Sequence, residues 1–289
     1  MIDIKNNLGT KEVNTWCPGC SNHMILESVK QTLARLIKSG KFKQEQFAMT
    51  ADIGCSSKIY DYLNISGIYG LHGRALPTAL GLTLGNPNLK VLSFIGDGGI
   101  YSEGMGHFMH AGRYNSDMVL IVHDNQSFSL TTGQPTATSQ MGYISKAAPQ
   151  GELDSPLNPI KIAIASGIGF IARCNSKDIK HTSEILEKAI KHNGFSFVEI
   201  IQDCLIFNKD INNKEDMMYK IEDNPDINKA MKFADEWDYN GKEGKIPLGV
   251  LYFGKKPSLA DKWPQLKKLK DDKISWKMFS TQKNYENSY

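Results

Sequence analysis

Apolar and polar residues follow two different periods along the chain, and their alternation predicts a fold. Over 22–38 apolar residues recur every three or four positions, which is typical of an amphipathic helix. Over 91–95 and 118–122 they form short unbroken runs, which favours strands buried on both faces. The same reasoning predicts helices over 22–38, 75–84, 103–113, 158–166 and 182–192, and strands over 46–53, 91–95, 118–122, 168–173 and 196–202.

Strands that alternate with helices predict an α/β fold, in which helices cover both faces of a parallel sheet. Ligands of such sheets bind beyond the carboxyl ends of the strands. Gly54, Asp97, Asn125 and Asp203 each follow a predicted strand, so we expect them at one rim. Residues 126–157 are polar and contain Gly, Pro, Ser and Thr throughout, and we expect them to form loops at the active site.

The β–α alternation ends near residue 205. Residues 208–224 are strongly charged, and residues 254–289 are rich in Lys. We therefore expect one domain over 1–205 and a C-terminal extension over 206–289. The extension is expected to be an extended arm that packs on the core or on a partner subunit.

Composition and charge exclude several classes of function. The net charge of +3 and the pI near 8.4 are far from the strongly basic footprint of a nucleic-acid binder. No apolar stretch has the length of a membrane span, and the N-terminus has no apolar signal-peptide core. We therefore expect a cytoplasmic protein whose five cysteines are metal ligands or core thiols rather than a disulfide framework.

Two short motifs close consecutive predicted strands. Gly96-Asp97-Gly98 follows the apolar run 91–95, and Asp124-Asn125 follows 118–122. A Gly-rich turn at a strand end presents bare backbone N–H groups to phosphate. Carboxylate and amide oxygens are hard ligands suited to Mg²⁺. This spacing predicts a diphosphate held through magnesium, as in thiamine diphosphate enzymes.

The cysteines predict a second centre. Cys17 and Cys20 form a C-x-x-C motif whose Pro-Gly turn lets both thiolates reach one metal, and Cys55 and Cys204 end the first and last predicted strands. Four thiolates hold either zinc or an iron–sulfur cluster, and spacing alone leaves both open. Thiamine diphosphate enzymes work through a carbanion, and a redox centre beside that carbanion would be a reason for the cysteines to hold iron rather than zinc. Cys174 lies in an apolar run and is expected to pack in the core.

Six motifs, in this order, resemble the β subunit of the 2-oxoacid:ferredoxin oxidoreductases. The resemblance covers roughly residues 14–205, with a weaker match at 246–250. The motifs are Trp16-Cys17-Pro18-Gly19-Cys20, Ile53-Gly54-Cys55-Ser56-Ser57-Lys58, Leu71-His72-Gly73-Arg74-Ala75, Gly96-Asp97-Gly98, His123-Asp124-Asn125 and Leu130-Thr131-Thr132-Gly133-Gln134.

The resemblance implies thiamine diphosphate, Mg²⁺ and one [4Fe–4S] cluster as cofactors. The implied cluster ligands are Cys17, Cys20, Cys55 and Cys204. The implied magnesium ligands are Asp97, Asn125 and the backbone carbonyl of Ser127. The positions implied to line thiamine diphosphate are Ile53, Gly54, Cys55, Ser56, His72, Gly96, Gly98, Gly99, Ser129 and Leu130.

His72 and Arg74 each have an implied role and an ordinary alternative, and Thr132 departs from the family pattern at a candidate substrate position. His72 is the candidate catalytic residue, although a His before Gly at a helix start is often only a cap or a core residue. Arg74 is a candidate substrate contact, but an Arg at this position is as often part of a surface ion pair. Thr132 stands where related archaeal chains often carry Lys, a residue thought to meet the substrate carboxylate.

The implied reaction is the oxidative decarboxylation of a 2-oxoacid to carbon dioxide and an acyl-coenzyme A. Electrons leave one at a time through the cluster to ferredoxin. The glutamate that activates thiamine is expected from a partner α subunit, so this chain alone should be inactive. The Lys clusters over 255–273 are either a solvated face or a surface that steers an acidic ferredoxin.

Two other functions stay open from the residues alone. One is a non-redox thiamine diphosphate-dependent decarboxylase or synthase half with a structural zinc. The other is a non-enzymatic module that zinc stabilises. The family often has an acidic residue after Gly-Asp-Gly, where this chain has Gly99. Together with Thr132, this departure leaves the identity of the 2-oxoacid open.

Overall fold

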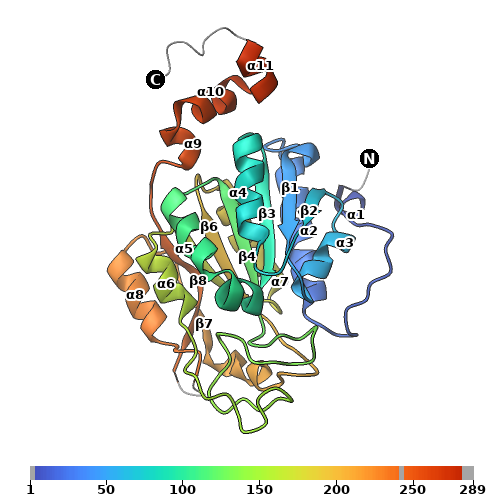
Figure 1. Ribbon diagram of the computed structural model, residues 1–289, viewed down its shortest axis with the longest axis vertical. Coiled ribbons are helices and arrows are strands. Elements are labelled where there is room, and N and C mark those ends of the chain that lie inside the picture. Colours follow the sequence, from blue (N-terminus) through green and yellow to red (C-terminus); the bar gives the residue numbers. More distant parts are fainter. Residues whose placement is uncertain (1–3, 241–243, 282–289) are drawn as a thin grey trace.

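The computed structural model describes residues 4–240 and 244–281. Its centre is an eight-stranded sheet with the strand order β2-β1-β3-β4-β6-β5-β8-β7 (Figure 1). The neighbouring strands pair in parallel, except that β8 runs antiparallel to β5. The expected α/β fold is therefore confirmed. The strands are β1 (Phe47–Ala51), β2 (Ser66–Tyr69), β3 (Lys90–Gly96), β4 (Met118–Asp124), β5 (Phe170–Asn175), β6 (Ser196–Ile201), β7 (Met218–Lys220) and β8 (Ile246–Phe253).

Helices cover both faces of the sheet, because successive strand side chains point to opposite sides. Phe47 and Met49 belong to the hydrophobic cluster on one face, and Ala48 between them belongs to the cluster on the other. The first face is covered by α2 (Asn22–Lys38), α3 (Ile59–Tyr62) and α7 (Ile179–Lys191). The second is covered by α4 (Ala75–Gly85), α5 (Met105–Tyr114), α6 (Pro159–Ala165) and α8 (Ile227–Asp235). The short helix α1 (Ile4–Asn7) packs on α2.

The helix over 22–38, whose apolar pattern is strongly periodic, has the predicted bounds. Residues 126–157, which were predicted to form loops, contain neither helix nor strand. The short strand β2 is absent from the prediction because it is a sheet edge with mostly exposed side chains, and so it lacks a buried apolar pattern. A π-helical turn over Gly98–Glu103, also unpredicted, joins β3 to α5.

The C-terminal extension is not wholly an arm. Its segment β8 pairs with β5 and extends the central sheet, and β7 pairs with β8. The edge of β5 would otherwise expose its backbone groups, so this pairing satisfies them. Pro247 and Gly249 interrupt the apolar run of β8, which explains why the strand was not predicted. Residues 241–243 and 282–289 of the expected extension lie outside the described residues.

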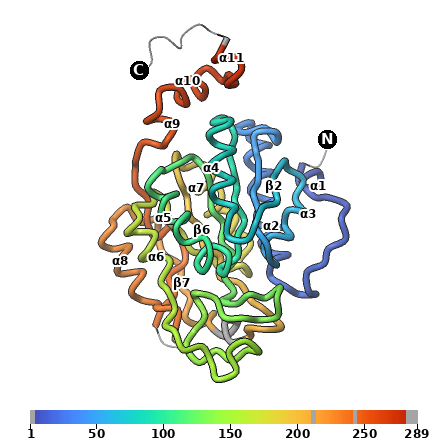
Figure 2. Tube along the Cα trace, in the orientation of Figure 1, coloured from blue at the N-terminus to red at the C-terminus, as the bar shows by residue number. Residues whose placement is uncertain are grey.

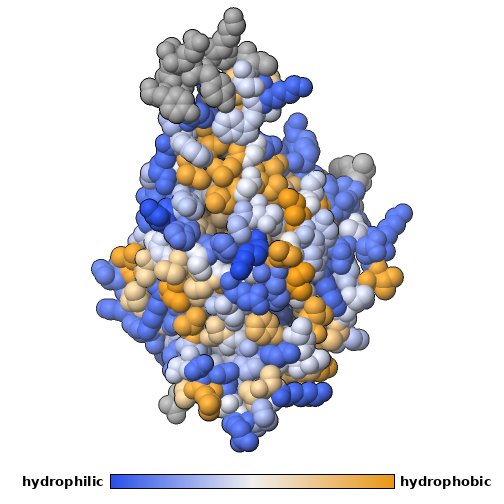
Figure 3. Space-filling model, viewed as in Figure 1, coloured by the Kyte–Doolittle hydropathy of each residue, from blue (hydrophilic) through white to orange (hydrophobic). Residues whose placement is uncertain are grey.

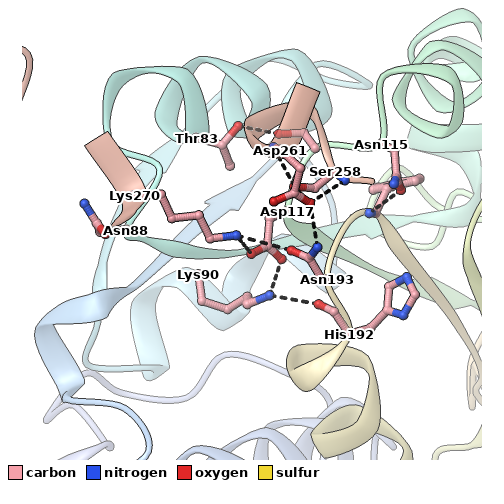
Figure 4. A network of polar contacts seen from close by, with 12 residues as sticks. Thr83, Asn88, Lys90, Asn115, Asp117, His192, Asn193, Ser258, Asp261 and Lys270 are labelled. Carbon is pink, nitrogen blue, oxygen red and sulfur yellow. Dashed lines mark hydrogen bonds and ion pairs between the residues drawn. The ribbon is translucent and has the colours of Figure 1, made fainter. Parts of the chain in front are cut away.

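The true arm comprises α9 (Leu259–Lys262), α10 (Pro264–Asp272) and α11 (Trp276–Thr281). A polar network holds its base against the start of the sheet (Figure 4). In this network Asp117 pairs with the buried Lys90, and its other oxygen lies 3.4 Å from Nζ of Lys270 in α10. Asn193 contacts two helices of the arm: its side chain accepts a hydrogen bond from Lys270 in α10 at 3.2 Å and donates one to Asp261 in α9 at 2.7 Å.

The arm and the polar loops lie at opposite ends of the molecule (Figure 2). The arm contacts residues that precede β3 and β4, such as Asn88 and Asn115, whereas the loop 126–157 follows the carboxyl end of β4. Apolar side chains gather where the arm meets α4 and α5, around a groove that includes Leu80, Leu84 and Trp263 (Figure 3).

Candidate active site

Four parallel strands end at one rim, and each supplies residues to the site directly after it ends. These strands are β1, β3, β4 and β6, which are neighbours in the sheet. The residues that follow them include Gly54, Asp97, Asn125 and Asp203, as the sequence predicts. All four residues line one or both of two adjacent cavities at this rim. The parallel arrangement therefore brings together motifs that lie up to 150 residues apart in sequence.

The first cavity gathers every residue that the sequence analysis assigned to thiamine diphosphate and magnesium. Their side chains or backbone form its wall together with Phe128, Thr131, His123 and Gln202, which the sequence analysis did not assign. The ring of Phe128 lies directly against Gly98, so a Cβ on this residue would collide with it. The absent side chain of Gly98 therefore makes room for this ring, while Gly96, Gly98 and Gly99 line the cavity with backbone that suits a phosphate group. The assigned residues in the wall are Ile53, Gly54, Cys55, Ser56, His72, Gly96, Asp97, Gly98, Gly99, Asn125, Ser127, Ser129 and Leu130.

Hard oxygen ligands are held in place beside this backbone. Oδ2 of Asp97 accepts a hydrogen bond from Thr136 Oγ1 at 2.6 Å. Oδ1 of Asn125 accepts from the backbone N–H of Ser127 at 3.1 Å. Burial raises the pKa of Asp97 to about 7, partly offset by hydrogen bonds from Thr136 and from backbone N–H groups. A buried carboxylate that is costly to ionise favours a bound cation, and this donor set fits Mg²⁺.

The second cavity is lined by four of the five cysteines. Cys17 and Cys20 come from the N-terminal loop, and Cys55 and Cys204 follow β1 and β6. The loop is held over the rim because Trp16 Nε1 donates to the carbonyl of Cys55 at 2.6 Å. Cys174 is wholly buried in β5 instead.

The thiols of the second cavity are suited to a group that spreads negative charge. Burial raises the pKa of Cys55 to about 11, with the Lys58 charge opposing this and the other three cysteines adding to it. Burial likewise raises the pKa of Cys20. Four thiolates around one cavity fit an iron–sulfur cluster, in which each binds a different iron. Within 4–240 and 244–281, no three His, Cys, Asp or Glu side chains converge on a single point that would hold one metal ion.

The two cavities share a wall. Cys55, Asn125, Ser129 and Gln202 line both of them. A group in the first cavity and a group in the second are therefore neighbours, separated by the side chains of this wall. Short separation is what electron transfer between two such groups requires.

His72 lies in the first cavity with two carboxylates behind it. Its Nδ1 is 3.1 Å from Oε2 of Glu103 and 3.6 Å from Oδ2 of Asp52. Asp52 is fully buried and accepts from Ser57 Oγ at 2.6 Å and from the backbone N–H of Gly73 at 3.2 Å. Burial raises the pKa of Asp52 to about 6, partly offset by these bonds and by His72. The sequence analysis missed Asp52, which looks like one more residue of a buried strand.

Arg74 and Thr132 are not part of the wall of either cavity. Arg74 donates through Nη1 to the carbonyl of Glu103 at 3.0 Å. Thr132 is exposed and has a φ of 79°, which is strained for a β-branched residue. Neither residue lines either cavity, so their assignment to the substrate stays a prediction.

Comparison with known proteins identifies the class and then the family. The model for the C-terminal TPP-binding domain of thiamine pyrophosphate enzymes matches residues 52–200. The 2-oxoacid:ferredoxin oxidoreductase subunit beta of Saccharolobus solfataricus is 38% identical over 255 residues, which are 83% of this chain and 82% of that one. The 2-oxoglutarate synthase subunit KorB of Methanothermobacter thermautotrophicus is 32% identical over 251 residues, 86% of this chain and 85% of that one.

A solved structure agrees with these relatives. It is the 2-oxoglutarate:ferredoxin oxidoreductase of Magnetococcus marinus with 2-oxoglutarate, coenzyme A and succinyl-CoA bound, with a TM-score of 0.84, 29% identity and coverage of 96% of both chains. The fold and the first cavity define a thiamine diphosphate-binding enzyme subunit. The chain belongs to the β subunits of the 2-oxoacid:ferredoxin oxidoreductases. Among the described residues, no helix has both the length and the apolar character needed to cross a membrane.

Proposed function

We propose that this chain and a partner α subunit oxidise a 2-oxoacid with coenzyme A to carbon dioxide and an acyl-CoA. Electrons pass through a [4Fe–4S] cluster, held by Cys17, Cys20, Cys55 and Cys204, to ferredoxin. The observation that carries the proposal is the wall shared by the two cavities. It supports a carbon centre and an electron acceptor as direct neighbours, which a structural zinc would not require.

Each side of the wall has a distinct task. When bound, thiamine diphosphate supplies the carbanion equivalent that lets a 2-oxoacid lose carbon dioxide. Asp97, Asn125 and the Ser127 carbonyl would hold the magnesium of its diphosphate, and Gly96, Gly98 and Gly99 would face the phosphates with bare backbone. Phe128 packs on Gly98, which shields this part of the cavity from water. His72, with Asp52 and Glu103 behind it, is a proton donor or acceptor at the cavity wall.

A partner subunit completes the first cavity. The naming of the relatives as β subunits implies such a partner, and we expect it to supply the glutamate that activates the thiamine ring and part of the substrate pocket. The substrate class is a 2-oxoacid, and 2-oxoglutarate is the first compound to assay, because it is bound in the Magnetococcus enzyme. The free cysteines and an oxygen-sensitive cluster suit the reducing cytoplasm, where we place the reaction.

Metal analysis of the complex tests this proposal. The chain is co-expressed with the α subunit from its neighbouring gene, purified without oxygen, and assayed for iron, sulfide, zinc, magnesium and thiamine diphosphate. We expect about four irons per β chain. Cys204→Ser should lower this content, and Cys174→Ser, its buried control, should not. A colourless protein that contains zinc would contradict the proposal.

A further inference from the structure

A hydrogen-bonded chain leads from the first cavity to a thiol of the second. Asn22 is the first residue of α2 and is wholly buried. Its Nδ2 donates to Sγ of Cys20 at 3.5 Å. Its Oδ1 lies 2.7 Å from Nδ1 of His123. His123 lines the first cavity, and Asn22 lines the second.

The chemistry of the groups fixes the direction of this chain. The amide oxygen of Asn22 can only accept a hydrogen bond, so Nδ1 of His123 must carry a proton and donate it. The amide nitrogen of Asn22 is thereby turned toward the sulfur. The His123 ring is itself held in place, since it packs edge-on against Phe94 with ring centres 6.2 Å apart. His123 therefore determines which end of the Asn22 amide faces Cys20.

The other side of the His123 ring faces the shared wall. Gln202, which lines both cavities, is within interaction range of His123. Among the described residues, neither Nε2 of His123 nor Oε1 of Gln202 makes a hydrogen bond of normal geometry. Two buried polar atoms that lack hydrogen-bond partners lower the stability of the folded protein, which a purely structural role would not explain. They belong to the boundary between the two proposed cofactors rather than to the packed core.

We propose that Asn22 is a positioning residue that sets the reduction potential of the cluster through its N–H···S bond to Cys20, and that His123 holds Asn22 in this orientation. The inference rests on the proposed function, because it needs the cluster. A hydrogen bond to a ligand sulfur stabilises the reduced, more negative state and so raises the potential. A second N–H···S bond, from the backbone N–H of Phe207 to Sγ of Cys204 at 3.4 Å, acts in the same direction, and its donor is not a side chain.

The test is an anaerobic redox titration of the cluster in the purified complex, followed by electron paramagnetic resonance. Asn22→Leu keeps the size of the side chain but removes the amide. We expect a lower potential, with a roughly tenfold smaller ratio of reduced to oxidised cluster at the wild-type midpoint, or about 59 mV for one electron. His123→Leu should shift the potential in the same direction by less, and His123→Asn, which can still donate, should restore it.

A matched control separates this effect from general loosening of the loop. Ser21 is buried next to Asn22, and its hydroxyl bonds to the backbone of Asp203; within the described part of the chain it makes no hydrogen bond to a sulfur. Ser21→Ala should therefore leave the potential unchanged, and an equal shift in this variant would overturn the inference. An unchanged potential in Asn22→Leu with full iron content would also overturn it. If Asn22→Leu loses the cluster, equal potentials in His123→Leu and wild type decide against it.

Iron analysis of the wild type separates failure of the proposed function from failure of the role inferred for Asn22 and His123. A wild-type complex without a [4Fe–4S] cluster would overturn the proposed function and this inference together. A full cluster whose potential does not respond to Asn22 or His123 would overturn this inference alone.

Discussion

The carboxylate of Asp52 fills the space that a side chain at Gly99 would need. A Cβ built on Gly99 would collide with Oδ2 of Asp52 and lie 3.0 Å from Ile95. This carboxylate directly follows β1 and lies behind His72.

This contact predicts that the stability cost of a side chain at position 99 depends strongly on the carboxylate at position 52. Gly99→Ala should destabilise the protein by about 1–3 kcal/mol, because the new methyl group meets a buried carboxylate and not a flexible chain end. Asp52→Ala in the same chain should remove most of that cost, which a double-mutant cycle of thermal unfolding would detect. Gly106→Ala is the control, since a Cβ there has no neighbour within 4 Å. It should be neutral or slightly stabilising, and equal costs in both variants would refute the steric argument.

Asp52 also predicts a pH dependence of stability. Its folded pKa of about 6 is above the ordinary value of 3.8. The folded state therefore binds the proton more tightly, so the contribution of Asp52 is full below the unfolded pKa and is lost as pH rises through about 6. Asp52→Asn removes this titration. Its melting temperature relative to wild type should therefore rise between pH 4.5 and pH 7, and a constant difference would contradict the assignment.

Asp97 should control cofactor binding through the cation. Asp97→Asn keeps the size of the side chain but removes the charge that holds magnesium. We expect the magnesium-dependent affinity of the complex for thiamine diphosphate to fall by at least about 100-fold, measured by titration calorimetry. Asp272→Asn, in the distant helix α10, should leave this affinity unchanged. Equal affinity in Asp97→Asn and wild type would place the cation elsewhere.

The lysines of the arm should not steer ferredoxin to the cluster of their own chain. The arm contacts residues that precede the strands, whereas the cysteine cavity follows their carboxyl ends. Lys267→Gln should therefore leave the salt dependence of ferredoxin reduction unchanged. Lys58 lines the cysteine cavity, so Lys58→Gln should slow the reduction several-fold at low salt. A loss of salt dependence in Lys267→Gln would restore the steering hypothesis.

The sequence predicts the parts of the site that follow directly from strand ends. Gly98, Asp97 and Asn125 could be assigned because short motifs close apolar runs, and parallel strands bring such ends to one rim. Asp52 could not be assigned, because only the packed structure shows its carboxylate beside Gly99. The chain from His123 to Cys20 joins a strand to a helix start, a contact that no local pattern encodes.

The secondary structure of the C-terminal part of the chain was harder to predict from the sequence for a different reason. β8 contains Pro247 and Gly249, which weaken a strand pattern, and it is stabilised by pairing with β5 rather than by its own propensity. The ends of α9–α11 are likewise fixed by tertiary contacts, such as the bond from Trp276 Nε1 to the carbonyl of Leu84 at 2.8 Å. Such contacts become visible only once the sheet is assembled.

We propose that oxidation of a 2-oxoacid in the first cavity reduces a cluster in the second. The most direct test of this proposal is rapid-freeze electron paramagnetic resonance of the anaerobic complex mixed with 2-oxoglutarate or another 2-oxoacid, with and without coenzyme A. We expect a reduced-cluster signal that precedes acyl-CoA release in wild type and in Cys174→Ser. We expect neither the signal nor the product in Cys204→Ser. Acyl-CoA formed at the wild-type rate by Cys204→Ser without a cluster would contradict the proposal.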